Sequence, residues 1–255
     1  MNIYKIIVQY KGTHYQGFQV QSVGRTIQGE INTALKLLSK SDEVKSVGSG
    51  RTDAGVHALA QVIRIEIPVD IPAENLARAM NSVLPDDIRV TNAAVVTNDF
   101  HPIFSAKSKE YNYVFSTDSL NSPFVGELMT YFSGELDIEL MKKGCALLCG
   151  EHDFINYQCV GTEVESTMRK IIACEIVHLD SLGHWKNFCG DYYVLKVTGN
   201  GFLKQMVRLL MGALVSLGKG KISLEDLEKS LKVPLKNRLG PTAPPQGLYL
   251  KEVHY

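Results

Sequence analysis

The chain has 255 residues, in which 27 lysines and arginines balance 27 aspartates and glutamates, and 45% of the residues are hydrophobic. This composition is globular, so it excludes a wholly disordered, collagen-like or coiled-coil chain. The length allows one large domain or two intimate ones. Overall neutrality counts weakly against a nucleic-acid binder, because neutralising phosphates takes lysines and arginines.

The sequence predicts no export signal and no membrane span. Its first residues lack a basic region, and no stretch reaches the roughly 18 apolar residues that a span requires. The five cysteines (Cys145, Cys149, Cys159, Cys174 and Cys189) are odd in number and form no CxxC pair. A complete disulfide framework and a zinc site are therefore not expected. We expect a cytoplasmic protein with reduced thiols and no bound metal.

The charge is unevenly distributed along the chain. Residues 1–60 carry seven basic and four acidic side chains, and residues 201–255 carry nine and four, whereas the residues between are acidic overall. If the two ends meet in space, they form one positive face. The alternative is a chance scatter of charges on a solvated surface.

The hydrophobic pattern alternates between strand and helix in the first part of the chain. Thr26 is placed to cap a helix whose apolar residues recur with the helical period, and Pro72 suits the first turn of a second helix. The expected elements in chain order are a strand over 3–10, a helix from 27 to 38, a strand over 62–67, a helix from 72 to 85 and a strand over 88–97.

The rest of the chain repeats this kind of order without a repeated sequence. We expect strands over 111–116 and 130–132, a helix over 138–149, strands over 169–179 and 192–198, helices over 202–217 and 224–231, and a strand over 247–253. Two α+β halves with mostly antiparallel sheets fit this order. The boundary is expected near residues 100–109, which gives an N-terminal half of 1–105 and a C-terminal half of 106–255.

Residues 47–58 (VGSGRTDAGVHA) carry the strongest chemical signal. Gly48, Gly50 and Gly55 permit close backbone approaches, and Arg51 and Asp53 lie between the last two of them. Read alone, the segment fits a surface turn with an Asx-type bond. A phosphate-binding loop is a rival interpretation, but the GxxxxGK[ST] pattern is missing.

Residues 50–58 (GRTDAGVHA) resemble the catalytic signature of the TruA-type tRNA pseudouridine synthases. Further motifs of that family follow one another along almost the whole chain. They are YKGTHYQGFQ at 10–19, TIQ at 26–28, FHPIFSA at 100–106, KEYNY at 109–113, GEHDF at 150–154, GFLKQMVR at 201–208 and APPQGLYL at 243–250.

The resemblance implies the pseudouridine synthase fold. In that fold, two related α/β-sandwich halves of the RRM or ferredoxin-like kind form a largely antiparallel mixed sheet flanked by helices. The active-site cleft lies between the N-terminal half, which carries the aspartate loop, and the C-terminal half. The implied activity is cofactor-independent isomerisation of uridine to pseudouridine in the anticodon arm of tRNA, by a homodimer.

The resemblance also assigns roles to individual residues. Asp53 matches the catalytic aspartate, which either attacks the sugar or abstracts its 2′ proton. Arg208 matches the arginine that pairs with this aspartate, and Arg51 is placed to contact RNA or to assist extrusion of the base. Tyr111 matches the tyrosine that stacks on the target base, and Leu248 matches an apolar wall of the pocket. Without the resemblance, Tyr111 and Leu248 would be interpreted as core residues.

Two departures from the family pattern lie outside the catalytic signature. Lys11 replaces an aspartate, and Phe18 stands where tryptophan is common. They concern loop contacts or RNA preference rather than the reaction. The remaining alternatives are the same chemistry on a different RNA, or an idle RNA-binding module on the same fold. His57 is expected to support the loop or to touch RNA, and His101 and His152 are expected to be structural.

Overall fold

A computed structural model describes residues 1–117, 122–161, 164–179 and 192–255. Cys189 and the expected loop over 180–190 lie outside these ranges. The chain divides into two compact units, which are considered separately: the first contains Met1–Lys107 and Tyr249–Tyr255, and the second contains Ser108–Leu248.

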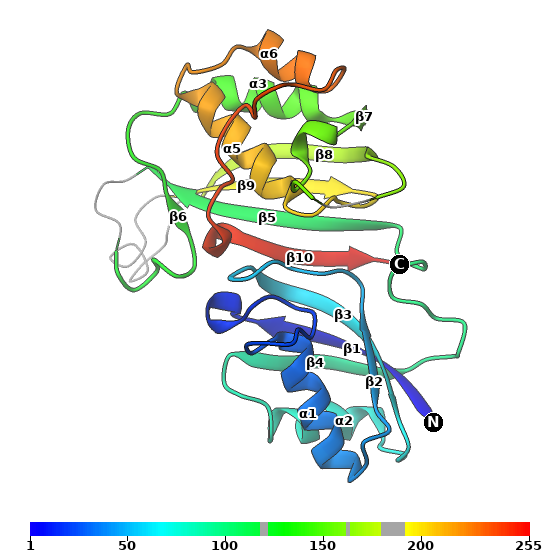
Figure 1. Ribbon diagram of the computed structural model, residues 1–255. Coiled ribbons are helices and arrows are strands. Elements are labelled where there is room, and N and C mark those ends of the chain that lie inside the picture. The colour runs from blue at the N-terminus through cyan, green and yellow to red at the C-terminus, as the bar shows by residue number, and fades with distance from the viewer. Residues whose placement is uncertain (118–121, 162–163, 180–191) are drawn as a thin grey trace. The chain divides into compact units, whose positions relative to one another are not determined.

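The first unit has the ferredoxin-like order of elements. Its strands pair in the order β4-β1-β3-β2, and these pairings are all antiparallel. Helices α1 and α2 lie side by side (Figure 1). The elements are β1 (Asn2–Tyr10), α1 (Ile27–Ser39), β2 (Lys45–Gly48), β3 (His57–Ile67), α2 (Ala73–Asn81) and β4 (Ile88–Val95).

Local sequence explains why these elements form where they do. In β1 the buried residues Tyr4, Ile6, Val8 and Tyr10 alternate with more exposed ones, as expected for a strand with one covered face. The Thr26 hydroxyl caps α1 by accepting the Gly29 N–H at 3.2 Å. The predicted cap and the predicted strand are both confirmed.

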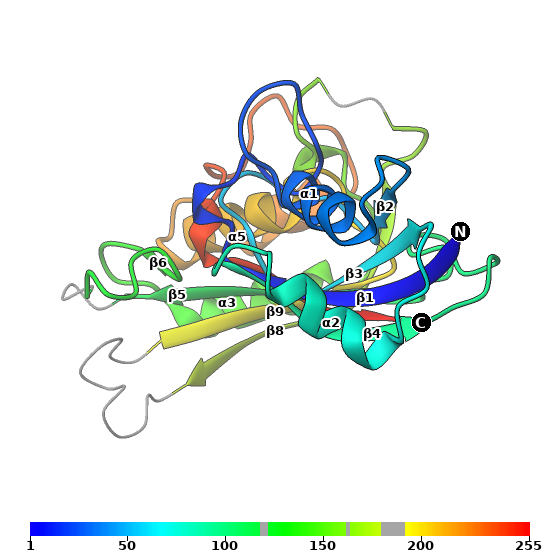
Figure 2. The same cartoon turned by 90° about the horizontal axis from the view of Figure 1, so that it is seen from below.

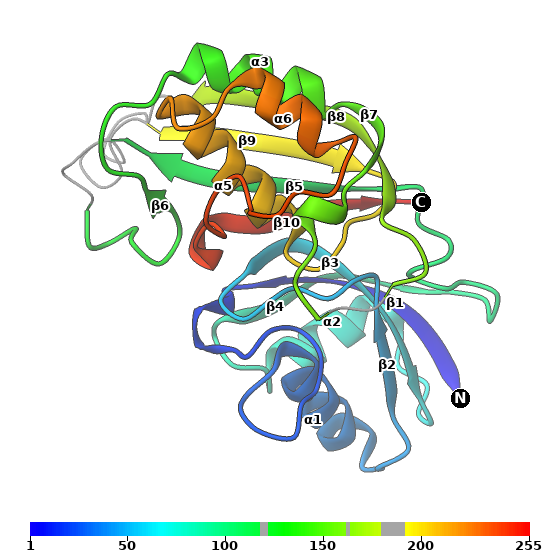
Figure 3. The same cartoon turned by 45° about the horizontal axis from the view of Figure 1, so that its top comes forward.

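The second unit follows the same plan. Its strands pair in the order β5-β9-β8-β7, so that β5, α3, β8, β9 and α5 correspond in order and pairing to β1, α1, β2, β3 and α2. The strands β8 and β9 run side by side (Figure 2), and α3 packs with α5 and α6 (Figure 3). The elements are β5 (Ser108–Ser116), β6 (Thr130–Tyr131), α3 (Ile138–Leu148), β7 (Gly150–Asp153), β8 (Met168–Leu179), β9 (Tyr192–Gly199), α5 (Met206–Gly218) and α6 (Leu224–Ser230).

Helix α5 forms the core of the second unit. Its residues are buried from Leu209 to Gly218, and a Cβ atom on Gly212 would lie 1.8 Å from the carbonyl oxygen of Pro241. The backbone around Pro241 therefore packs directly on the helix backbone. The longest described helices, α1 and α5, have 13 residues each, whereas a bilayer span takes about 20. No helix in the described ranges could therefore span a bilayer.

The α+β fold with related halves is confirmed, and several details differ from the expected elements. Strand β3 begins at His57 rather than at residue 62, and helix α2 ends at Asn81 rather than at residue 85. The short strands β2 and β7 were not expected. Helix α5 begins at Met206 rather than at Phe202, because Gln205 before it has a left-handed backbone with φ 63°. The last strand, β10 (Leu248–His254), pairs in parallel with β3 through Tyr249 and Leu250, a pairing that the sequence did not predict. The sequence of a strand does not specify its partner, so this pairing could not be anticipated.

Candidate active site

Asp53 lies on the loop between β2 and β3, in the first unit. The Asp53 carbonyl accepts the Val56 N–H at 3.1 Å, which closes a tight turn. Gly55 in this turn has φ +78°, a conformation that favours glycine. Asp53 is half-buried and Arg51 is exposed. Asp53 is therefore partly shielded from solvent, whereas Arg51 is not.

Segment 10–18 holds this loop from one side. The hydroxyls of Tyr10 and Thr52 are hydrogen-bonded at 2.8 Å in a buried position, and the Phe18 N–H donates to the Thr52 carbonyl at 3.1 Å. The Gly55 N–H donates to the Tyr15 carbonyl at 3.3 Å. A Cβ atom on Gly17 would lie 2.7 Å from the Thr52 carbonyl oxygen. These contacts fix the backbone on both sides of Asp53.

His57 supports the loop from its C-terminal end. It is buried, its Nδ1 accepts the Gly12 N–H at 3.0 Å, and its ring stacks on Tyr249 with centroids 4.7 Å apart. An acceptor Nδ1 places the proton of the neutral ring on Nε2. A Cβ atom on Gly12 would lie 2.0 Å from the Val56 carbonyl oxygen. His57 therefore supports the loop, one of its two expected roles.

Two further contacts hold the N-terminal end of the loop. The Ser49 hydroxyl donates to Gln61 Oε1 at 2.7 Å, and Gln61 Nε2 donates to the Gly50 carbonyl at 2.9 Å. Phe18 is buried over Gly48, where a Cβ atom would lie 2.5 Å from the ring. Phe18, one of the two departures from the family pattern, thus packs against the N-terminal end of the Asp53 loop.

Tyr111 lies on β5, in the second unit. It is 8% exposed and shares the buried face of the strand with Tyr113 and Phe115. Its ring meets Phe202 edge-on, with centroids 5.1 Å apart and planes at 79°. The ring is therefore held between strand and loop, and Phe202 is a neighbour that the sequence did not identify.

Arg208 lies in the first turn of α5 and is anchored to the segment before β10. Its Nε donates to the Ala243 carbonyl at 2.8 Å, and the Ala243 N–H donates to the Arg208 carbonyl at 3.1 Å. Burial raises the pKa of Tyr113, while the bond to Thr130 and the charge of Arg208 oppose that rise. The guanidinium of Arg208 therefore lies close enough to Tyr113 for its charge to oppose the rise in the pKa of the Tyr113 hydroxyl.

Tyr113 connects the predicted residues of the second unit. Its hydroxyl donates to the Pro244 carbonyl at 2.8 Å, and its Cε1 would lie 2.8 Å from a Cβ atom on Gly247. Leu248 follows directly and is 5% exposed. Tyr113 thus joins β5, which carries Tyr111, to the segment that holds Arg208 and Leu248. Its alternation with Tyr111 along β5 is the signal that could have identified it.

The predicted residues therefore fall into two sets. Asp53 and Arg51 share one loop of the first unit, whereas Tyr111, Arg208 and Leu248 belong to the second.

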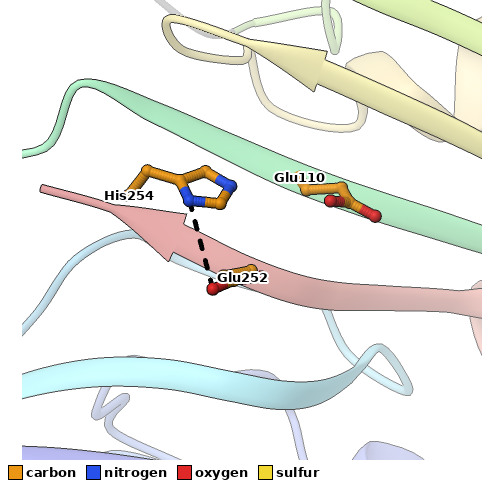
Figure 4. Close-up of side chains that lie close together, drawn as sticks. All are labelled: Glu110, Glu252 and His254. Atoms are coloured by element: carbon orange, nitrogen blue, oxygen red, sulfur yellow. Dashed lines mark ion pairs between the residues drawn. The ribbon is translucent and has the colours of Figure 1, made fainter.

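On β10, Nδ1 of His254 lies 4.0 Å from Oε1 of Glu252, and the two side chains form an ion pair when His254 is protonated (Figure 4). Their side chains are 44% and 52% exposed, so the pair contributes little to stability.

The chain is similar to a known family and to bacterial proteins of its own length. The sequence model of the tRNA pseudouridine synthases matches residues 6–105 and 145–255. A tRNA pseudouridine synthase A of Bacillus pumilus is 42% identical over 252 residues, covering 98% of both chains. Proteins of the same name from Listeria monocytogenes and Bacillus subtilis are 39% and 38% identical, covering all of both chains and 98% of both chains, respectively. The chain belongs to the tRNA pseudouridine synthase family.

Proposed function

We propose that this protein isomerises uridine to pseudouridine in the anticodon arm of tRNA, with Asp53 as its catalytic residue. The observation that carries the proposal is the match to tRNA pseudouridine synthase A over 98% of both chains. Within this chain, support comes from the Asp53 loop, which is held by a side-chain hydrogen bond from Thr52 to Tyr10 and by backbone hydrogen bonds to Tyr15 and Phe18. A fixed loop suits a group that must meet one atom of its substrate.

The reaction needs an ionised carboxylate and no redox step. The bond between N1 of uracil and C1′ of the ribose breaks, the base turns, and C5 forms a new bond to C1′. The proton on C5 is then lost, and N1 gains one. Asp53 either attacks C1′ or abstracts the 2′ proton, and both roles stay open. A carboxylate used in either way must remain charged at neutral pH.

The other predicted residues have supporting roles in this proposal. Tyr111 stacks on the extruded base, Arg208 pairs with Asp53, Leu248 forms an apolar wall and Arg51 contacts RNA. The support in the second unit is local: the Tyr111 ring is held against Phe202, and the Arg208 Nε is anchored on Ala243. An aromatic face and an anchored cation suit a flipped nucleotide. The proposed assembly is a homodimer.

The experiment is single-turnover conversion of an unmodified tRNA transcript by the purified protein. Wild type should form pseudouridine, and Asp53→Asn should lose at least about 10³-fold in rate, because it removes the charge of the carboxylate. Its affinity for tRNA, measured by filter binding, should stay within about threefold of wild type. Substantial conversion by Asp53→Asn would exclude the role of Asp53. Binding without conversion by wild type would favour an idle RNA-binding module.

A further inference from the structure

Gln61 lies on β3, where the Asp53 loop leaves the sheet. On one edge of β3, Ile63 lies opposite β2 and Ala58 lies opposite β10. The strand that pairs with this edge therefore changes between Ala58 and Ile63, and Gln61 lies in that interval. Residues 49–56 connect β2 to β3, so the loop leaves the sheet beside this change of partner.

The Gln61 amide binds the loop just past the backbone pairing of β2 with β3. The Ser49 N–H still donates to the Val62 carbonyl at 2.8 Å. Beyond this bond, the Ser49 hydroxyl donates to Gln61 Oε1 at 2.7 Å, and Gln61 Nε2 donates to the Gly50 carbonyl at 2.9 Å. A side chain of β3 thus continues, for two residues of the loop, the pairing that the backbone began.

Gln61 is also connected to the loop through Tyr10. Tyr10 is buried on β1, and its hydroxyl is hydrogen-bonded to that of Thr52 at 2.8 Å. Burial raises the pKa of Tyr10, and side-chain hydrogen bonds to Thr52 and Gln61 oppose that rise. One amide is therefore joined to Gly50 directly and to Thr52 through one hydroxyl. Thr52 directly precedes Asp53.

The Gln61 side chain is fully buried, which is costly for an amide unless its polar atoms are hydrogen-bonded. Methionine would fill similar space without that cost. The amide adds direction, because its hydrogen bonds are satisfied together only when the loop backbone lies in one place. The reaction depends on this placement, since displacing a catalytic group by about 1 Å costs on the order of 10²-fold in rate.

We propose that Gln61 is a positioning residue for the reaction, which sets the place of the Asp53 carboxylate through its bonds to Gly50 and to the pair of Tyr10 and Thr52. Gln61 itself does not touch RNA in this proposal. The inference rests on the proposed function, since it takes Asp53 as the catalytic residue.

The first test compares Gln61→Met with Asn81→Leu, a control in the same unit. The Asn81 amide also makes two hydrogen bonds, to the Val90 N–H and carbonyl at 2.8 Å each, but it joins α2 to β4. Both variants should melt at a lower temperature than wild type, because each leaves polar groups unpaired.

The rate with saturating tRNA, measured well below both melting temperatures, separates positioning from stability. Single-turnover conversion should fall about 10²-fold in Gln61→Met and stay within about twofold of wild type in Asn81→Leu. The tRNA concentration that gives half of the maximal rate should change less than about threefold in both, because no RNA contact is removed. A saturating rate that is unchanged in Gln61→Met, or equally reduced in Asn81→Leu, would overturn the inference.

The second test is a double-mutant cycle with Tyr10→Phe, which removes a single oxygen atom. Tyr10→Phe alone should lower the saturating rate by about tenfold, and its combination with Gln61→Met should lose less than the product of the two effects, because both act through one network. Losses that multiply would overturn the inference. If Gln61→Met does not fold, unchanged rates in both Tyr10→Phe and Ser49→Ala would overturn it. Wild type that forms no pseudouridine would instead refute the proposed function itself.

Discussion

Replacing Gly12 by alanine tests whether segment 10–18 holds the Asp53 loop in place. The new Cβ atom would lie 2.0 Å from the Val56 carbonyl oxygen, about 1 Å inside the shortest separation that real Cβ atoms show. The two backbones must therefore separate by about 1 Å, which also stretches the buried bond from the Gly12 N–H to His57. Overpacking and a weakened buried hydrogen bond together should cost about 2–5 kcal/mol of unfolding free energy.

The catalytic rate should fall as well, because displacing a catalytic group by about 1 Å costs on the order of 10²-fold. The assays are urea unfolding and single-turnover conversion of tRNA, with Gly126→Ala as the control. A Cβ atom on Gly126 would have its nearest neighbours at 3.9 Å, so this variant should stay within about 0.5 kcal/mol of wild type. Wild-type stability and rate in Gly12→Ala would refute the proposed coupling between segment and loop.

Two further predictions concern the second unit. Tyr111→Phe should retain most single-turnover activity and Tyr111→Ala should lose it, because stacking needs the ring rather than the hydroxyl; equal losses would assign the role to the hydroxyl instead. Cys149 and Cys174 should react slowly with iodoacetamide at pH 8 and faster as the pH rises. Burial raises the pKa of Cys149, and the hydrogen bond to Cys145 together with burial raises that of Cys174, so little thiolate is present at pH 8. Mass spectrometry that finds equal labelling rates in folded and unfolded protein would contradict this.

Local signals predicted much of the fold. The cap at Thr26 and the alternation in β1 depend on neighbouring residues, and both elements form where the pattern indicates. The succession of strands and helices also sufficed to predict two α+β halves. The pairing of β10 with β3 was not predicted, because the partners are about 190 residues apart and alternation does not encode a partner.

The candidate site was predicted by resemblance, and most of its supports were not, although loop support was one of the two roles expected of His57. Asp53, Arg208 and Tyr111 come from motif matches. In contrast, the hydrogen bonds that hold Thr52, the contacts of His57 and the contacts of Tyr113 join segments that are distant in the sequence. The bond from Tyr113 to the Pro244 carbonyl joins residues 131 positions apart. Contacts of this kind arise only when the chain folds, so a local pattern can place Tyr113 on the same strand face as Tyr111 but does not reveal its distant partner.

The most direct measurement maps pseudouridines in total RNA from cells that carry or lack this protein. We predict that modifications in the anticodon arm of tRNA disappear without the protein, return with the wild-type chain and stay absent with Asp53→Asn. Modifications that persist without the protein, or that Asp53→Asn restores, would contradict the account.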